Sequence, residues 1–545
     1  MVNIKLLSDI WNMPNSSVVT DPVSRFQLYN QSLNSQCNVA IIGAGVSCSY
    51  TVIHYISLLL KQASRQRVKL VVIDKAGEFW TGIPYGYRSG QQSLIISSLK
   101  EFFPQPELDI FKEWLNLNYR EVFNTPDRQA GLLVSRWQEL YAADMSAGCW
   151  DELFIPRYAV GLYLKERIDR LLQAAQDLVE CHLVAAEAID IQAVGDQYQI
   201  EMIAKNQPQS FLTAQKVILA MGSPPNKGNH LAPDTMIGDG FCYIENMYEP
   251  TQSFNVDRIG QILKKSAHPQ QNKVVIVGSN ASALETIYSL NNHPEIVGLI
   301  DKFIVISPNA AFPDRICEAT TADKYQPQAL QALLQSPEPT AQQMLTAVQE
   351  DVDRALAQNE TVGSTYALIS KGIINVLQQL SPAEQKLFVI KYGVEIGKFQ
   401  RRAGNDYLNV VENLISTGKL EFIKGKLLQT CLLNDQEQGF EFIDANHQKQ
   451  CFATAVQVVV NCAGFQDLMT STSPLINNLI KRGIAIPNDS NCGFTVNEDF
   501  EINENFYLMG PLVAGNINSK FKVWHAESCA RIISLSQQLA VVLAA

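Results

Sequence analysis

The residues with the clearest chemical meaning are two glycines that follow a short apolar run. Residues 37–48 read CNVAIIGAGVSC, in which a β-branched run breaks at Gly43 and Gly45 and then continues into a helical pattern. Gly43 permits a sharp turn, and Gly45 lets the backbone approach a pyrophosphate. The N-terminus of the helix adds free N–H groups and a partial positive charge, which favour phosphate. This spacing predicts a dinucleotide site.

A second strand completes the unit about thirty residues later, the length of a βαβ half. The segment KLVVID ends at Asp74, whose carboxylate can accept a hydrogen bond from a ribose hydroxyl. The GxGxxG pattern is incomplete, because Cys48 stands where Gly or Ala would allow close packing of the helix. Taken alone, the motif also fits an ordinary glycine-rich turn in a parallel sheet.

The same pattern returns at residues 274–285, which read VVIVGSNASALE. Gly278 opens this turn, and Asn280 replaces the second glycine. We expect Asn280 to adopt a positive φ, which Asn tolerates better than most residues. The following strand, KFIVIS, ends at Ser307 without an acidic residue. Because an acid there would repel the 2′-phosphate of NADP, its absence favours NADPH over NADH.

Three further segments predict strands that end at a glycine. They are VILAMGSPP, VVVNCAGFQ and NFYLMGPL, and their glycines are Gly222, Gly464 and Gly510. Taken alone, each is better explained as a core strand followed by a turn. Their order along the chain, one after each glycine-rich unit and one before a C-terminal helix, is more informative than any single segment.

This series resembles the two-dinucleotide-binding flavoproteins, which include N-hydroxylating monooxygenases and pyridine-nucleotide disulfide reductases. The resemblance implies that the first unit binds FAD and the second NAD(P)H. The segments GIPYG (82–86), FIPRYAVGLYLKERI (154–168) and GSNASALE (278–285) are similar to the bacterial family of FAD-NAD(P)-binding proteins. GSNASALE also resembles the turn of lysine and ornithine N-hydroxylases, with matching residues at Gly278, Ser279, Ser282, Ala283 and Glu285.

The resemblance also implies a set of cofactor-binding residues. Arg157 and Tyr163 match a region that packs beside the isoalloxazine and nicotinamide, and Trp80 and Tyr85 match a loop over the flavin, with core packing as the alternative for these two aromatic residues. The whole predicted set is Gly43, Ala44, Gly45, Ser47, Asp74, Lys75, Tyr85, Arg157, Gly222, Gly278, Asn280, Ser282, Ser307, Gly464, Gly510 and Pro511.

Two arginines are candidates for a substrate or phosphate contact. Arg401 and Arg402 in KFQRRAGNDY could clamp a substrate carboxylate or the NADP phosphate, since a guanidinium matches both in a bidentate way. A solvated basic turn is the alternative. His525 opens the last helical segment, where a helix N-terminus would face the flavin, but a capping or packed histidine is the commoner case.

The cysteines and histidines predict neither a metal site nor a redox pair. Eleven cysteines are scattered along the chain, the closest are eleven positions apart, and seven histidines show no HxH or HExxH spacing. A disulfide reductase needs a cysteine pair near the flavin, so we set that branch aside. Gly510 is also followed by Pro511 instead of the aspartate that such reductases use.

The chain is predicted to be α/β, with two Rossmann-like dinucleotide-binding domains and a helical insertion. We expect an N-terminal extension at 1–36, the first part of the FAD domain at 37–230, the NAD(P)H domain at 231–450 and the second part of the FAD domain at 451–545. The insertion, at about 311–400, would cap a site or form an oligomer surface.

Composition narrows the class of partner. The chain has 545 residues, 46% hydrophobic and 18% charged, which is typical of globular proteins, and its net charge of −11 opposes binding to nucleic acid or anionic membranes. It shows no signal-peptide pattern and no apolar run of about twenty residues, so we expect a cytoplasmic protein.

Together these observations predict an FAD-dependent, NADPH-using monooxygenase that oxygenates an amine nitrogen of a small metabolite through a C4a-peroxyflavin. The cofactor carries this chemistry, so the lack of a recognisable catalytic triad counts little. The expected partners are a small-molecule substrate and O₂, with a homo-oligomer possible. Two alternatives stay open: a flavin oxidase or dehydrogenase with a vestigial nicotinamide domain, and a non-catalytic flavin-binding protein.

Overall fold

The structure is a computed structural model. It describes residues 35–62, 67–124, 131–228, 231–232, 240–266, 269–315, 325–360, 362–399, 402–434, 437–524 and 529–545. Nearly all of the predicted N-terminal extension, Arg401 and His525 lie outside these ranges.

The first sheet is built around five parallel strands in the order β17-β6-β1-β2-β3. The strands are β1 (Ser35–Ile42), β2 (Val68–Asp74), β3 (Val179–Ala185), β6 (Ser210–Leu219) and β17 (Phe506–Leu508), with β16 (Glu501–Asn503) antiparallel at one edge. The segment EAIDIQAVGDQYQIEMIA, whose alternating pattern around a Gly-Asp turn predicts a hairpin, forms β4 (Glu187–Val194) and β5 (Gln197–Ile203), which turn at Gly195 with φ 65°. The sheet therefore combines segments from both ends of the chain, as expected for a split FAD domain.

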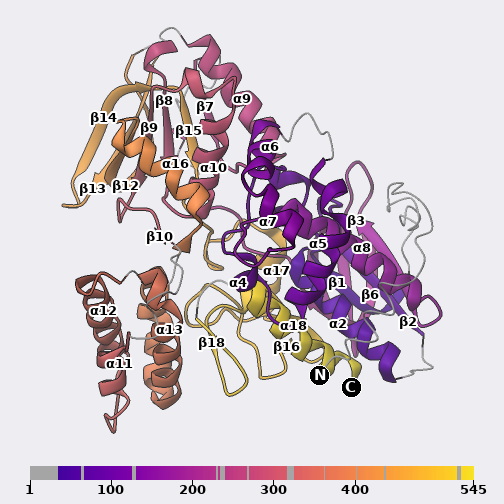
Figure 1. Cartoon of the computed structure of the whole chain (residues 1–545). Helices are drawn as coiled ribbons and strands as arrows, with labels where there is room; N and C mark the ends of the chain where they lie inside the picture. The colour runs from indigo at the N-terminus through magenta and orange to yellow at the C-terminus, as the bar shows by residue number, and fades with distance from the viewer. Residues whose placement is uncertain are drawn as a thin grey trace.

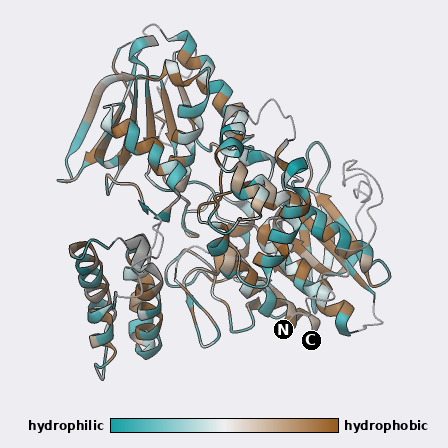
Figure 2. Cartoon of the chain, in the orientation of Figure 1, coloured by the Kyte–Doolittle hydropathy of each residue, from teal (hydrophilic) through white to brown (hydrophobic). Residues whose placement is uncertain are grey.

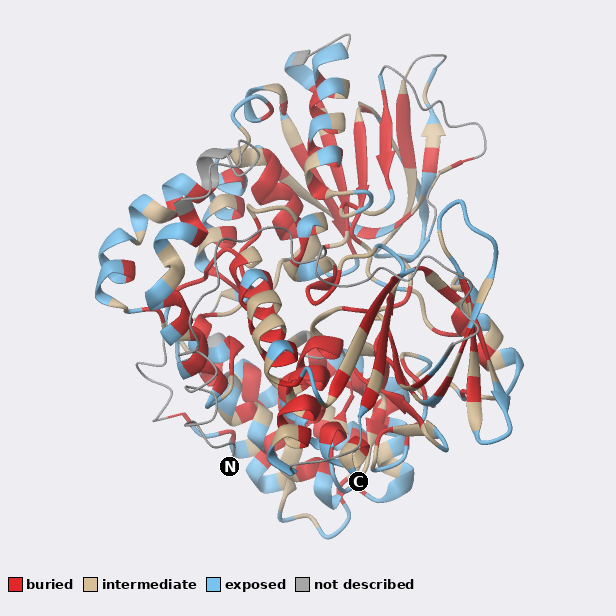
Figure 3. Ribbon diagram, turned by 90° about the vertical axis from the view of Figure 1, so that its right-hand side faces the viewer, coloured by how far each residue is buried: buried red, intermediate tan, exposed pale blue. Residues whose placement is uncertain are grey.

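Helices surround this sheet (Figure 1). The long ones are α2 (Val46–Gln62), α5 (Glu107–Asn124), α8 (Tyr158–Ala174) and α18 (Cys529–Ala544), and α18 packs along α2. The shorter ones are α3 (Gly82–Tyr85), η2 (Tyr87–Ser89), α4 (Leu99–Phe102), α6 (Gly131–Leu140), α7 (Ala142–Ala147), α17 (Pro474–Lys481) and η6 (Pro511–Val513). The buried parallel strands are almost continuously apolar, as strands covered on both faces require (Figures 2 and 3).

The second sheet has the order β14-β13-β12-β9-β8-β15-β7. Its strands are β7 (Cys242–Ile244), β8 (Lys273–Val277), β9 (Lys302–Ser307), β12 (Leu420–Leu432), β13 (Gln438–Asp444), β14 (Lys449–Val456) and β15 (Val458–Asn461). One face packs on α9 (Gln252–Lys265), α10 (Ala281–Asn292) and α16 (Asn405–Ser416), and the other packs on side chains of the β12–β14 meander. Short turns η3 (Pro269–Gln271) and η4 (Val297–Leu299) complete the domain.

The boundary predicted at residue 450 needs correction. Strands β14 and β15, residues 449–461, pair within the second sheet, where β15 lies between β8 and β7. The chain therefore returns to the first domain only after Asn461. The sequence misled here because VVVN is a buried parallel strand that fits either sheet equally well.

The helical insertion has a hydrophobic core of its own. It contains α11 (Gln328–Leu333), α12 (Ala341–Ala357), α13 (Val362–Gln379), α14 (Pro382–Leu387), a π-helical turn η5 (Phe388–Tyr392) and α15 (Gly393–Phe399). The short parallel pair β10 (Asp314–Arg315) and β11 (Arg402–Ala403) closes its base. Ile517 of β18 (Asn516–Ile517) and Trp524, which follows β19 (Lys522–Val523), join its core from the C-terminal part of the chain.

In the described part of the chain, every helix is too short or too polar to cross a lipid bilayer.

Candidate cofactor-binding sites

The first cradle lies at the carboxyl end of β1. Gly43 has φ 94° and donates its N–H to Ile73 O at 2.8 Å, while Ala220 at the end of β6 donates to Ile42 O at 2.8 Å. A Cβ at Gly43 would lie 2.4 Å from Ala220 O. Only glycine fits, because both the positive φ and this crowding exclude a side chain.

Gly45 differs from Gly43, because open space lies beside it. A Cβ built on Gly45 would find only Gly82 Cα, at an ordinary 3.7 Å, and one built on Gly222 would find no heavy atom within 4 Å. Helix α2 begins at the next residue, Val46, so its first N–H groups face this open side. These residues fit a dinucleotide pyrophosphate, which needs a close backbone approach at a helix N-terminus.

Three other predicted residues of the first site, Ser47, Asp74 and Gly510, lie around this turn. Asp74 Oδ2 accepts a hydrogen bond from Ala44 N at 3.2 Å, so the carboxylate that closes β2 lies at the turn, as expected. The last strand also reaches the cradle, since a Cβ at Gly510 (φ 98°), just before Pro511, would lie 2.5 Å from Ser47 Oγ of α2. Lys75 instead forms an exposed ion pair with Glu187 at 3.0 Å.

The loop after β2 folds back over α2. Ser49 Oγ donates to Trp80 O at 2.7 Å, and Trp80 is buried. Tyr85 packs edge-on against Phe102, and burial raises the pKa of its phenol well above the usual value. The side chain of Tyr85 also contacts Cys529 at the start of α18. Both rings are therefore part of the packing that holds this loop in place.

The second cradle repeats the backbone of the first. Gly278 has φ 105° and donates to Ile306 O at 2.8 Å, and Cys462 at the end of β15 donates to Val277 O at 2.8 Å. A Cβ at Gly278 would lie 2.3 Å from Cys462 O, whereas one at Gly464 would meet nothing within 4 Å. Gly464 thus has the same place here as Gly222 in the first site.

The positive φ expected for Asn280 is not found. Asn280 is the N-cap of α10 with φ −95°, an extended conformation that any residue adopts. Gly278 alone makes the left-handed step of this turn. Ser282 lies in the first turn of α10, where its carbonyl accepts from Thr286 Oγ1 at 2.7 Å. Ser307, buried at the end of β9, accepts a hydrogen bond from Ala310 N at 3.1 Å.

Arg157 is held by the other domain. Its guanidinium donates to both carboxylate oxygens of Glu285 on α10, at 2.7 and 2.8 Å. Burial by itself would lower the pKa of Arg157, but the Glu285 carboxylate outweighs it and the net shift is upward, so Arg157 is charged. The prediction that Arg157 packs beside the flavin did not include its pairing with Glu285. Glu285 was visible in the GSNASALE resemblance, but its partner, 128 residues away, was not.

Tyr163 and Arg402 are likewise occupied by protein groups. Tyr163 OH donates to Glu107 at 2.7 Å in a buried cluster with Arg167 and Tyr50, inside the first domain. Arg402 pairs with Glu101 of α4 at 3.3 Å, at the base of the insertion. The structure thus gives Arg402 a role in joining the insertion to the first domain.

Two cysteines that are distant in sequence lie close together. Cys431 and Cys451 have their Sγ atoms 3.8 Å apart on the β12–β14 meander, a pair that residue spacing did not reveal. The pair belongs to the second sheet, whereas a disulfide reductase would need it beside the first cradle. Among the described residues, no cluster of three or more His, Cys, Asp or Glu side chains could hold a metal ion.

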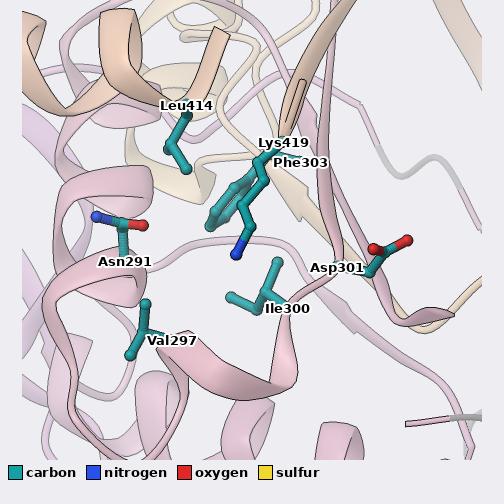
Figure 4. Close-up of a pocket in the computed structure, with 7 residues that line it drawn as sticks. All are labelled: Asn291, Val297, Ile300, Asp301, Phe303, Leu414 and Lys419. Atoms are coloured by element: carbon teal, nitrogen blue, oxygen red, sulfur yellow. The ribbon is translucent and has the colours of Figure 1, made fainter. Parts of the chain in front are cut away.

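A surface hollow elsewhere in the second domain does not coincide with either cradle. It is lined by Asn291, Val297, Ile300, Asp301, Phe303, Leu414 and Lys419 (Figure 4). These residues lie at the amino ends of β9 and β12, whereas ligands of open α/β sheets bind at the carboxyl ends. The cradles, not this hollow, are therefore the candidate sites.

Comparison with known proteins places the first cradle within a known family. The model of a family described as FAD-NAD(P)-binding matches residues 40–224. An uncharacterized protein of Mycobacterium bovis is 30% identical over 512 residues, which are 93% of this chain and 95% of the relative. The chain belongs to the FAD-NAD(P)-binding family. Uncharacterized proteins of two Mycobacterium tuberculosis strains match this chain with the same identity and coverage.

Solved structures show the same fold over nearly the whole length of this FAD-NAD(P)-binding protein. A cadaverine monooxygenase from Erwinia amylovora, solved with FAD, has a TM-score of 0.52 and 11% identity and covers 94% of this chain and 95% of its own. An ornithine hydroxylase from Pseudomonas aeruginosa has a TM-score of 0.50 and 12% identity, with coverages of 93% and 98%. At this identity the likeness concerns the fold.

Proposed function

We propose that this protein is an FAD-dependent monooxygenase that uses NADPH and O₂ to oxygenate an amine nitrogen of a small metabolite. The observation that carries the proposal is the pair of cradles, each with a glycine held under a neighbouring strand and an open glycine beside it. Two such sites in one chain fit an enzyme that passes a hydride from one dinucleotide to another.

The residues at the carboxyl end of β9 favour NADPH over NADH. Ser307 ends that strand, and its register partner on β12 is Lys424, whose side chain is exposed. A lysine attracts the 2′-phosphate that an acidic residue would repel. Sequence reasoning missed Lys424, because β12 follows β9 only after the insertion.

The amine substrate is inferred from the fold. The cadaverine monooxygenase and the ornithine hydroxylase that share this fold are named for amines, and both solved structures match nearly the whole chain. A nitrogen of such a substrate is nucleophilic when deprotonated and can take up an electrophilic oxygen atom. The exact amine is left to the experiment.

FAD, when bound, would accept the hydride and activate O₂. The protein would bind and orient the cofactors and the substrate and exclude water. Gly43, Gly45 and the start of α2 would hold the FAD pyrophosphate, and Asp74 a ribose hydroxyl. Gly278 and the start of α10 would hold the phosphates of NADPH. The loop around Trp80 and Tyr85, held by the Ser49–Trp80 hydrogen bond and by the packing of Tyr85 on Phe102, would cover one side of the flavin.

The insertion would close the substrate side. Trp524 packs into its core against Phe388 of the π-helical turn, and Trp524 directly precedes the segment that leads to α18. Since the start of α18 contacts Tyr85, the insertion is tied to the flavin loop through a short stretch of chain. This connection favours a capping role over an oligomer surface.

The experiment is to add a panel of small diamines and amino acids to the purified protein with FAD, NADPH and O₂. The proposal predicts faster NADPH oxidation with one amine and a hydroxylated product equal to the NADPH consumed. If every amine leaves the rate unchanged and all NADPH appears as H₂O₂, the oxygenase proposal fails.

A flavin oxidase with a vestigial nicotinamide site is the second candidate. Asn280 favours this candidate, because it holds the place in the second cradle that Gly45 holds in the first. Its side chain occupies space that Gly45 leaves open for a phosphate. In that case an amine reduces the flavin directly without any NADPH.

A further inference from the structure

Helix α10 has two roles in this molecule. Its N-terminus follows the Gly278 turn and forms part of the second cradle, and one turn further on its side chains contact the first domain. The position of a nicotinamide relative to the flavin therefore depends on how α10 is held. Glu285 is the residue of α10 that makes the strongest of these contacts.

We propose that the Arg157–Glu285 pair is a positioning element that sets the nicotinamide domain on the FAD domain for hydride transfer. This rests on the proposed function. Arg157 is the N-cap of α8 in the first domain, and Glu285 lies on α10 in the second. The side chains are 11% and 5% exposed, so water screens their attraction little.

The geometry of the pair fixes the relative orientation of the Arg157 guanidinium and the Glu285 carboxylate as well as the distance between them. The two parallel N–H···O bonds, at 2.7 and 2.8 Å, hold the guanidinium and carboxylate in one plane. Tyr248, in the loop between β7 and α9 of the second domain, donates its hydroxyl to Glu285 Oε2, and its ring lies 5.7 Å from the Arg157 guanidinium carbon. An apolar contact could slide, whereas this arrangement resists rotation of α10.

Neighbouring contacts connect the pair to residues 92–94 of the first domain, which follow the loop around Trp80 and Tyr85. Arg157 N donates to Ser93 O at 2.9 Å, and Leu94 N donates to the hydroxyl of Tyr407 on α16 at 2.8 Å. Ser289, one turn after Glu285, donates to Gln92 at 3.2 Å. Residues 92–94 are thus held between Arg157 and the two helices α10 and α16.

The covalent links between the domains allow movement that the pair would restrain. The segments after Gly222 and Gly464 pair with each other, through Lys227 N to Gly464 O at 2.7 Å and Gln466 N to Pro225 O at 2.8 Å. Two crossing segments of this kind can act as a hinge, because a few backbone dihedrals absorb a domain rotation.

A second buried pair supplies the control. Arg167 and Glu107 are 8% and 5% exposed, carry the same charges and lie entirely within the first domain. Substituting them perturbs a buried ion pair without touching the domain interface. We therefore compare R157K and E285Q with R167K and E107Q.

The measurements are flavin content at 450 nm, the Kd of NADP⁺ by calorimetry and the rate of anaerobic flavin reduction at saturating NADPH. In R157K and E285Q we expect the rate to fall about 10- to 100-fold while flavin content and Kd change by less than about threefold. Small-angle X-ray scattering of these variants should show a larger radius of gyration. In R167K and E107Q rate and radius should stay near wild type.

The positioning role is overturned if R157K and E285Q keep the wild-type rate, or if all four variants lose rate and flavin together, as general instability would cause. A wild type that NADPH does not reduce refutes the proposed function instead. In that case the scattering comparison still decides whether the pair orients the domains, and unchanged radii overturn it.

Discussion

The turns after β1 and β8 are closed by the same two backbone hydrogen bonds. Gly43 and Gly278 each donate to the neighbouring strand at 2.8 Å, and each sits under a carbonyl, that of Ala220 or Cys462, within 2.4 Å of where a Cβ would be. The backbone of the dinucleotide turn is thus the same in both domains. Strand geometry alone is enough to require these two glycines.

The two turns differ in the side chains that would meet a ligand. The first has the open Gly45 and the acidic Asp74, whereas the second has Asn280 and Ser307 at the corresponding places. The closure of the turn therefore does not distinguish one dinucleotide from another. Ligand preference has to be tested at the positions where the two cradles differ.

The largest effect should come from Gly45→Val. A Cβ there finds only Gly82 Cα at 3.7 Å, so the protein tolerates it, but the branched side chain fills the space for the pyrophosphate. We expect a folded protein that retains no FAD after gel filtration, measured by absorbance at 450 nm and by thermal unfolding. Gly43→Ala is the contrasting variant, which should lose stability because of the clash with Ala220 O. Full flavin occupancy in Gly45→Val would refute the first site.

Gly278→Val should separate the two sites. The side chain meets Cys462 O and distorts the second turn, so the variant should lose stability as Gly43→Ala does, while the first cradle keeps its FAD and reduction by NADPH slows by about tenfold or more. Stopped-flow reduction at several NADPH concentrations measures this. Loss of FAD in this variant would show that the two sites are not independent.

Asp74→Ala should weaken FAD binding less than Gly45→Val. One ribose contact is lost while the phosphate cradle remains, and a hydrogen bond to a charged acceptor contributes about 1.5–3 kcal/mol. Asp74 also accepts from Ala76 N at 3.0 Å and Glu78 N at 3.1 Å, so some stability is lost as well. Fluorescence titration of the apoprotein with FAD checks this. An unchanged Kd would make Asp74 a purely structural strand end.

The smallest effect is expected from Ser307→Asp. A carboxylate at the end of β9 repels a 2′-phosphate and can accept from a free ribose hydroxyl, so the ratio of NADH to NADPH reduction rates should rise. Lys424 stays in place and limits the change to about tenfold. A ratio equal to that of wild type would place the adenosine ribose away from β9.

Sequence reasoning succeeded where the signal is local. Short runs of apolar residues and glycines indicate the two turns, the hairpin around Gly195 and the insertion. It failed where contacts are distant along the chain. Neither the Arg157–Glu285 pair nor the approach of Cys431 to Cys451 has a local pattern, because tertiary packing alone creates them. For the same reason β15 was assigned to the wrong sheet.

The central claim is that one cradle binds FAD and the other binds NADPH. Anaerobic titration of the purified protein with NADPH and with NADH, followed at 450 nm, tests it most directly. The account predicts a yellow protein that one equivalent of NADPH bleaches, and that NADH bleaches more slowly. A flavin that neither nucleotide reduces would contradict it, and would mean that the second cradle keeps the backbone of a dinucleotide site without its ligand.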